Sequence, residues 1–254
     1  MKSKVVALFL LMDKINRKLI KYLKRTEKRN YYDFPETCQI PNLSTIYELF
    51  FGRQPGFLVE VGAYDGITYS NTSGLIEKGW QGILIEPIPD FYNATLARYE
   101  KNKKIKLVNK AVGEKSGELL LNLSGPLTSG SSKIQSEYEN LEWAKKFLTN
   151  SSISVHVETL TKILDDLNVP QVFDVLVIDV EGFEKEVLAG FNWQKYSPRM
   201  VIIELADFHP DMTNQREINR KLSKEISSQG YEIVYKDYIN TVFIEVSYLE
   251  SLNR

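Results

Sequence analysis

The segment from residue 60 to residue 66 reads E-V-G-A-Y-D-G and combines a carboxylate with two glycines. Gly62 and Gly66 permit a sharp turn and a close approach of the backbone to a ligand, because glycine lacks a Cβ and tolerates positive φ. The dinucleotide-binding pattern G-x-G-x-x-G is absent, since Tyr64 stands where its second glycine would be. The carboxylate of Glu60 would repel a phosphate and suits a ligand with a cationic amino group. A plain strand-to-helix turn is the alternative interpretation.

A second carboxylate, Glu86, ends the next apolar run and is followed directly by Pro87. In nucleotide-binding α/β folds, an acid at the end of the second strand accepts hydrogen bonds from both hydroxyls of a ribose. The same position also suits an acid that merely faces solvent. Together with the glycine turn, Glu86 favours a nucleoside-containing ligand.

The third feature is Asp179-Val180-Glu181-Gly182, which follows the most continuously apolar run of the chain. Two carboxylates after a buried strand are costly unless they have partners or a catalytic task. The alternative is that Asp179 or Glu181 lies at the N-terminus of the next helix and is stabilised by its dipole.

A carboxylate or histidine near a hydroxyl group of a substrate can take the proton of that hydroxyl. The candidates for such a base, in falling order, are Asp179, Glu181, Glu204 and His209. The three acids among them could also hold Mg²⁺ or Ca²⁺, which prefer oxygen ligands. No ligand spacing in the sequence demands a metal, and we expect none.

The elements that must position these residues alternate along the chain. Strands are predicted at 57–61, 82–86, 105–109, 118–123, 153–157, 172–180, 200–205, 231–235 and 241–246. Helices are predicted at 70–78, 89–101, 137–148, 159–167, 183–191 and around 218–226. This alternation indicates an α/β fold with a mostly parallel sheet covered by helices on both faces, closed by an antiparallel strand pair at one edge. Ligands of such sheets bind at the carboxyl ends of the strands, where the three acidic segments lie.

Charge is distributed unevenly over the 254 residues. The first 30 residues carry a net charge of about +8, and the remainder carries about −9. An acidic body without a basic face excludes nucleic acid as the main partner. We assign residues 1–50 to a basic helical N-terminal extension and residues 51–254 to the catalytic domain.

The extension contains an apolar run at 5–12 that is too short to span a bilayer, followed by a basic amphipathic pattern. Residues 1–30 are therefore expected either to make weak peripheral contact with an anionic membrane or to form a solvated helix. The single cysteine, Cys38, excludes a disulfide within the chain and fits a reducing, cytoplasmic compartment.

The ordered set of motifs resembles the FkbM-type methyltransferase family over roughly residues 54–206. The motifs that carry the resemblance are F-L-V-E-V-G-A-Y-D-G at 57–66, S-N-T at 70–72, G-W-Q-G-I-L-I-E-P at 79–87, N-K-A-V at 109–112, V-E-T-L at 157–160, D-V-E-G-F-E at 179–184, V-L-A-G at 187–190 and I-I-E at 202–204. Members often have Asp and Asn where this chain has Glu60 and Tyr64.

The resemblance implies a seven-stranded class I (Rossmann-like) methyltransferase fold, S-adenosylmethionine as the methyl donor and O-methylation of a hydroxyl on a sugar, a glycan or a natural product. By position, Glu86 would hold the ribose, Ala111 with Lys110 would lie along the adenine, and Asp179 would lie near the sulfonium. The cofactor-binding residues that it implies are Glu60, Gly62, Ala63, Gly66, Asn71, Glu86, Pro87, Lys110, Ala111 and Asp179.

Two other functions stay open from the sequence: a methyltransferase-like binding module without activity, and an oxidoreductase that uses NAD. The acceptor would be selected by the first 50 residues, the segment 127–146 and the segment after Glu204. Tyr138, Trp143 and Phe147 could stack on a sugar face, although their spacing equally suits packing. The sequence makes no prediction of the oligomeric state.

Overall fold

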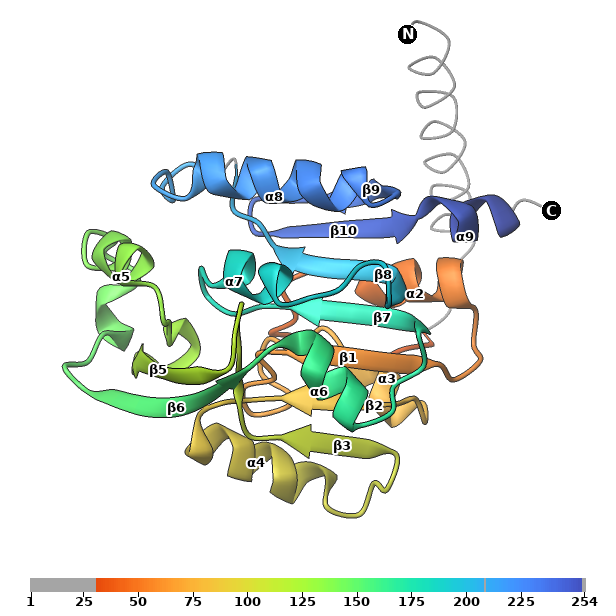
Figure 1. The fold of residues 1–254 in the computed structure, drawn as a ribbon, viewed down its shortest axis with the longest axis horizontal. Helices are drawn as coiled ribbons and strands as arrows, with labels where there is room; N and C mark the ends of the chain where they lie inside the picture. Colours follow the sequence, from red (N-terminus) through yellow and green to blue (C-terminus); the bar gives the residue numbers. More distant parts are fainter. Residues whose placement is uncertain (1–30, 208, 253–254) are drawn as a thin grey trace, which may run out of the picture.

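A seven-stranded sheet forms the centre of the computed structural model, which describes residues 31–207 and 209–252 (Figure 1). Its strands are β1 (Phe57–Val61), β2 (Gln81–Ile85), β3 (Ile105–Val108), β7 (Val172–Ile178), β8 (Ser197–Glu204), β9 (Tyr231–Lys236) and β10 (Asn240–Glu245). They lie in the order β3-β2-β1-β7-β8-β10-β9. Strand β10 runs antiparallel to both β8 and β9, and the other pairs are parallel. The predicted mostly parallel sheet is confirmed, with the antiparallel strand one place in from the edge.

Both faces of this sheet are covered, because the side chains of its strands alternate between two apolar clusters. Leu58 belongs to one cluster and its neighbour Val59 to the other. The Val59 face packs against α6 (Leu160–Asp166), α7 (Glu184–Ala189) and α8 (Arg216–Ser228). The Leu58 face packs against α2 (Leu43–Phe51), α3 (Ser73–Glu77) and α9 (Val246–Ser251), and α4 (Pro89–Tyr99) joins β2 to β3.

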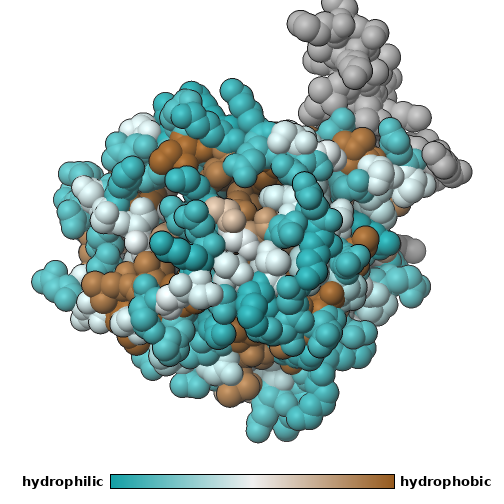
Figure 2. All heavy atoms as spheres, viewed as in Figure 1, coloured by the Kyte–Doolittle hydropathy of each residue, from teal (hydrophilic) through white to brown (hydrophobic). Residues whose placement is uncertain are grey.

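A smaller three-stranded sheet lies beside the carboxyl ends of the central strands (Figure 1). It contains β4 (Ala111–Val112), β6 (Ser152–Glu158) and β5 (Gly117–Asn122), in that order. Short 3₁₀ turns at Gly125–Leu127 and Lys145–Phe147 and helix α5 (Ser132–Tyr138) complete this layer. Figure 2 shows a mostly hydrophilic surface with an apolar patch over β5, where Leu120 is 60% exposed.

Helix α5 corrects the prediction of a helix at 137–148. It starts earlier because the hydroxyl of Ser131 accepts a hydrogen bond from the backbone N–H of Ile134, which caps the first turn. It ends near residue 138, where the side-chain amide of Asn140 donates to the carbonyl of Ser136 at 2.7 Å. That carbonyl is the acceptor that the backbone N–H of residue 140 would use in a continued helix.

The packed body of the protein begins earlier than the predicted boundary at residue 51. That boundary falls inside α2, and residues 31–50 contribute to the core on the Leu58 face. Tyr32 and Tyr47 are fully buried, and both rings pack around Trp80. The predicted membrane contact of residues 1–30 lies outside the described residues. None of the helices in the described part of the chain is long and apolar enough to cross a bilayer.

Candidate active site

A cavity of about 410 Å³ opens at the carboxyl ends of β1, β2, β7 and β8. It lies where the strand order reverses between β1 and β7, which is the expected ligand position in an open α/β sheet. Its volume is within the range of small-molecule sites. The residues predicted for the site that line it are Glu60, Gly62, Ala63, Glu86, Pro87, Lys110, Ala111, Asp179, Glu181, Glu204 and His209.

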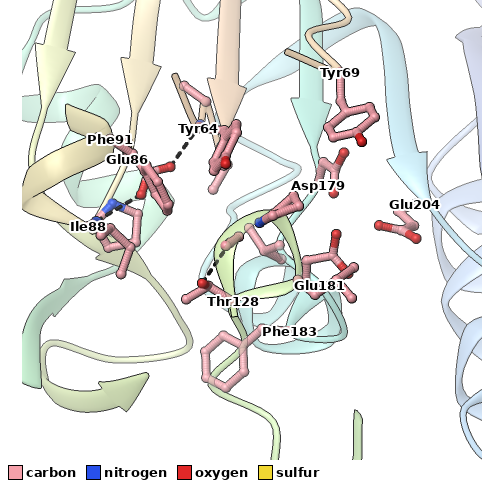
Figure 3. Close-up of a pocket in the computed structure, with 18 of the residues that line it drawn as sticks. Tyr64, Tyr69, Glu86, Ile88, Phe91, Thr128, Asp179, Glu181, Phe183 and Glu204 are labelled. Carbon is pink, nitrogen blue, oxygen red and sulfur yellow. Dashed lines mark hydrogen bonds between the residues drawn. The ribbon is translucent and has the colours of Figure 1, made fainter. Parts of the chain in front are cut away.

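Glu86 lies at one end of this cavity (Figure 3). Its carboxylate accepts hydrogen bonds from the backbone N–H groups of Tyr64 (2.9 Å) and Ile88 (2.8 Å). A carboxylate has about four acceptor sites, so capacity remains for two hydroxyls. The rings of Tyr64 and Phe91 pack beside it with centroids 4.2 Å apart. This end therefore combines a hydroxyl acceptor with apolar walls, as a nucleoside requires.

Glu60 is only 3% exposed and lies deeper in the same cavity. Thr72 donates its hydroxyl hydrogen to Glu60 at 2.7 Å. Burial raises the pKa of Glu60 to about 8 and that of Glu86 to about 7. A bound cation would favour the charged form of both side chains, so the site is suited to a ligand that carries positive charge.

Burial of these two acids predicts how stability depends on pH. Because their pKa values are higher in the folded protein than in the unfolded chain, the folded state binds more protons between about pH 4.5 and pH 8. We expect the free energy of unfolding of the cofactor-free protein to fall over this range, by about 1.4 kcal/mol per pH unit for each titrating group. Urea unfolding at a series of pH values measures this slope.

The variant Glu60→Gln serves as the control for that dependence, since it cannot ionise. Its slope should be smaller than that of the wild type between pH 5 and pH 8. Acids whose pKa is lowered, such as Asp65, titrate below this window and do not interfere. A wild-type protein that becomes more stable as the pH rises through the window contradicts the prediction.

Gly62 lines the cavity, but the reason for a glycine there differs from the one expected. A Cβ at Gly62 would lie 1.7 Å from the carbonyl oxygen of Asp179, and its φ is +89°. The tight approach is therefore between the ends of β1 and β7 and not between backbone and ligand. Gly66 and Asn71, two of the residues predicted to bind the cofactor, do not line the cavity. Gly66 packs against Thr95 and Tyr99 of α4.

Asp179, Glu181 and Glu204 converge at the end of the cavity away from Glu86 (Figure 3). One carboxylate oxygen from each lies within 4.8 Å of the others. Burial raises the pKa of all three, and for Glu204 and Glu181 the neighbouring acids raise it further. Tyr138 donates its hydroxyl hydrogen to Glu181. Acids with raised pKa values are suited to accept a proton near neutral pH.

The structure argues against the helix-terminus interpretation of the D-V-E-G segment. Helix α7 begins only at Glu184, and its N-cap residue is Phe183. Glu184 itself turns back and accepts a hydrogen bond from the backbone N–H of Gly182 at 3.1 Å. Asp179 and Glu181 lie before the helix and face the cavity.

His209 lines the cavity, and its hydrogen bonds make it less suited than the three acids to act as the base. Its Nδ1 accepts from the backbone N–H groups of Asp211 (3.1 Å) and Met212 (3.2 Å). A neutral imidazole has one acceptor nitrogen, so Nε2 carries the proton and has no lone pair to offer. His209 therefore remains the last of the four base candidates, as in the predicted order.

Strained backbone marks the same cavity. Five non-glycine residues of the described chain have positive φ, namely Asn42, Tyr64, Tyr69, Asn168 and Glu181. Tyr64, Tyr69 and Glu181 line the cavity. Such strain persists only where surrounding contacts enforce it, and it concentrates at functional sites.

Several lining residues were missed by sequence reasoning. They belong to the loop after β5, to turns between elements and to helix α4, and include Tyr69, Ile88, Phe91, Thr128 and Phe183. Ser129, next to this loop, donates its hydroxyl hydrogen to the carbonyl of Glu181 at 2.6 Å. The only sequence signal was the cluster of Ser and Gly around residue 130, which predicted a loop without its position. Tyr138, Trp143 and Phe147 do reach the cavity wall.

The fold and the site together define a class I methyltransferase architecture, with a nucleoside-binding acid after β2 and acids after β7 and β8. Residues 60–233 match the family described as Methyltransferase FkbM domain, which is more than half of the chain. The protein therefore belongs to the FkbM methyltransferase family, as its motifs predicted, and its cofactor is S-adenosylmethionine.

Solved structures offer more distant likenesses. A putative O-methyltransferase from Klebsiella pneumoniae is 10% identical, with a TM-score of 0.44 and coverage of 92% of this chain and 89% of that one. The O-methyltransferase TomG from Streptomyces achromogenes is 12% identical, with a TM-score of 0.43 and coverage of 80% and 77%. A comparison with curated proteins found no match.

The residues present fit S-adenosylmethionine. Glu86 offers the acceptor for ribose hydroxyls beside the Tyr64–Phe91 pair, and Ala111 belongs to an apolar cluster with Ile88 beside it. Glu60 and Asp179 supply carboxylates for the cationic methionine end. The cavity thus offers acids that would face the charged end of the cofactor and apolar walls that would face its adenine.

Proposed function

We propose that the protein transfers the methyl group of S-adenosylmethionine to a hydroxyl of a sugar, a glycan or a hydroxylated natural product. The observation that carries the proposal is the group of three acids at the end of the cavity opposite Glu86. An alcohol loses its proton when its oxygen is methylated, so a nearby carboxylate with a raised pKa serves the reaction.

The cofactor, when bound, supplies a methyl group that already carries a good leaving group. The protein must therefore mainly align the acceptor and exclude water, and alignment can contribute up to about 7–11 kcal/mol. Asp179 is the preferred base among the three acids, because it directly follows the central strand β7. Burial raises the pKa of Asp179 and so favours its uptake of a proton.

Aromatic side chains support a sugar-like or ring-containing acceptor. Tyr69, Tyr138, Trp143 and Phe147 line the cavity, and Trp143 is 44% exposed although it is a large apolar residue. Aromatic rings stack on the apolar faces of sugars and other rings. The acids next to them would repel a phosphorylated acceptor, so we propose a neutral or cationic one.

Replacing Glu86 with Ala tests the cofactor site. We expect the affinity for S-adenosylhomocysteine to fall by about 10- to 100-fold, since each hydrogen bond to a charged group contributes about 1.5–3 kcal/mol. Calorimetric titration of wild type and variant measures the change. Glu118→Ala is the matched control, because Glu118 lies on β5 outside the cavity and bonds to Ser154.

The outcomes separate the proposed function from its alternatives. Binding by the wild type that is unchanged in Glu86→Ala refutes the ribose role of Glu86. Binding of S-adenosylhomocysteine without methyl transfer to any member of a panel of glycans, glycosides and small alcohols would favour an inactive binding module. Tight binding of NAD in its place would favour an oxidoreductase.

The compartment and the partners are further parts of the proposal. A single cysteine is compatible with the cytoplasm, which we propose as the site of action. The net charge of −1 and the acidic cavity support a small-molecule or glycan acceptor and not a nucleic acid.

A further inference from the structure

Three carboxylates from two neighbouring strand ends share one small volume. Asp179 follows β7, Glu181 lies two residues further on, and Glu204 is the last residue of β8. Each offers an oxygen that lies within 4.8 Å of the other two. In Figure 3 the three side chains point toward one another from different parts of the backbone. Like charges this close require a compensating positive charge or bound protons.

No ion pair in the described part of the chain neutralises this group. The ion pairs present all join other residues, and none includes Asp179, Glu181 or Glu204. The Oε2 atom of Glu204 is buried and has no hydrogen-bond partner there. A buried acceptor without a partner is costly, and aimed at two further carboxylates it calls for a ligand with positive charge.

The polar groups next to the three acids already have hydrogen-bond partners of their own. Tyr138 satisfies one oxygen of Glu181, and the Nδ1 atom of His209 accepts backbone hydrogens. Ser129 holds the Glu181 carbonyl, which fixes the strained backbone of that residue (φ 53°) and keeps its side chain among the other acids. Free carboxylate oxygens therefore remain at the centre of the group, beside the cavity.

We propose that Asp179, Glu181 and Glu204 bind one divalent cation, which we take to be Mg²⁺. Hard cations of this kind are bound by carboxylate oxygens, and Mg²⁺ usually keeps several water ligands as well. Those remaining ligand positions face the cavity, where the acceptor binds under the proposed function. The cation would take one oxygen of Asp179, hold the acceptor oxygen and lower the pKa of its hydroxyl. The second oxygen of Asp179 would remain the base of the proposed O-methylation, on which this inference rests. The sequence-based expectation of no metal is revised by this inference.

Binding of Mn²⁺ to the full-length protein, freed of metal with a chelator, tests the site without any need for activity. Electron paramagnetic resonance reports free Mn²⁺, and Mg²⁺ should compete for the same site. We expect one bound equivalent per chain and a rise in melting temperature on addition of Mn²⁺. In Glu204→Gln the affinity for Mn²⁺ should fall by about tenfold or more, because losing even a group that only supports the metal ligands costs about 10- to 100-fold in metal affinity.

Glu86→Gln is the matched control, because Glu86 is also a buried acid after a strand of the same cavity but lies at its other end. It should bind Mn²⁺ like the wild type while its affinity for S-adenosylhomocysteine falls. Glu204→Gln keeps the volume of the side chain, and circular dichroism checks that it folds.

Two results overturn the proposal: no saturable Mn²⁺ binding by folded wild type at millimolar concentration, or equal binding by wild type and Glu204→Gln. Either would mean that protons shared among the acids compensate their charge. If methyl transfer proceeds but one of these two results is found, the proposed function stands and the metal site fails. If Mn²⁺ binds but no methyl transfer is found, the metal site stands and the proposed function fails.

Discussion

Asp179→Asn is expected to lower the turnover of methyl transfer by about 10²- to 10⁴-fold, the range that a general base contributes. Asparagine has nearly the same shape as aspartate but cannot take a proton at neutral pH. The affinity for S-adenosylhomocysteine should change much less, because Glu86 and the apolar walls at the other end of the cavity are untouched. Turnover is measured with the best acceptor from the panel, and affinity by calorimetry.

Stability distinguishes a catalytic role of Asp179 from a structural one. Asp179 is crowded by two other acids, and burial raises its pKa. In metal-free protein, removing its charge should therefore leave the melting temperature unchanged or raise it. A lower melting temperature with normal turnover would show that Asp179 serves the fold. Glu118→Gln, an exposed acid on β5, controls for the loss of a negative charge as such.

Gly62→Ala should destabilise the fold by more than about 4 kcal/mol, an exceptional loss for a single substitution. The added Cβ would lie 1.7 Å from the Asp179 carbonyl oxygen, and main chain on both sides leaves no flexible atom to move away. The neighbouring backbone is fixed as well, since Gly62 N–H donates to Ile85 and Asp179 N–H donates to Val61. Urea unfolding followed by circular dichroism measures the loss.

Gly230→Ala is a matched control for this substitution. Gly230 has nearly the same φ (+92°), but a Cβ there would meet no atom within 4 Å. It should cost only about 1–2 kcal/mol, the penalty for a side chain in left-handed backbone. Comparable losses in the two variants would mean that backbone strain, and not the contact with β7, explains Gly62. A soluble Gly230→Ala beside an unfolded Gly62→Ala agrees with the prediction.

The general architecture was readable from the sequence because it depends on local patterns. The apolar run 172–180 predicted a central strand, and β7 is buried in the middle of the sheet. Glu86 and Asp179 follow predicted strands in the sequence. That both lie on one edge of the sheet then follows from the rule that parallel strands present their carboxyl ends on the same edge. Helix α5 shows the limit of such patterns, because it ends near residue 138, where the side-chain amide of Asn140 donates to the Ser136 carbonyl, and not at residue 148 as predicted.

Which residues share the site was decided by contacts between distant segments. Sequence patterns fixed that Asp179 and Glu204 end strands, but only the pairing of β7 with β8 brings their carboxylates together. Likewise, Gly66 belongs to the glycine motif yet packs on α4, outside the cavity. The chain by itself therefore determined its elements, its family and the edge of the sheet that binds the ligand. Tertiary structure decided the membership of the site, because side chains far apart in sequence meet only once the strands have found their neighbours.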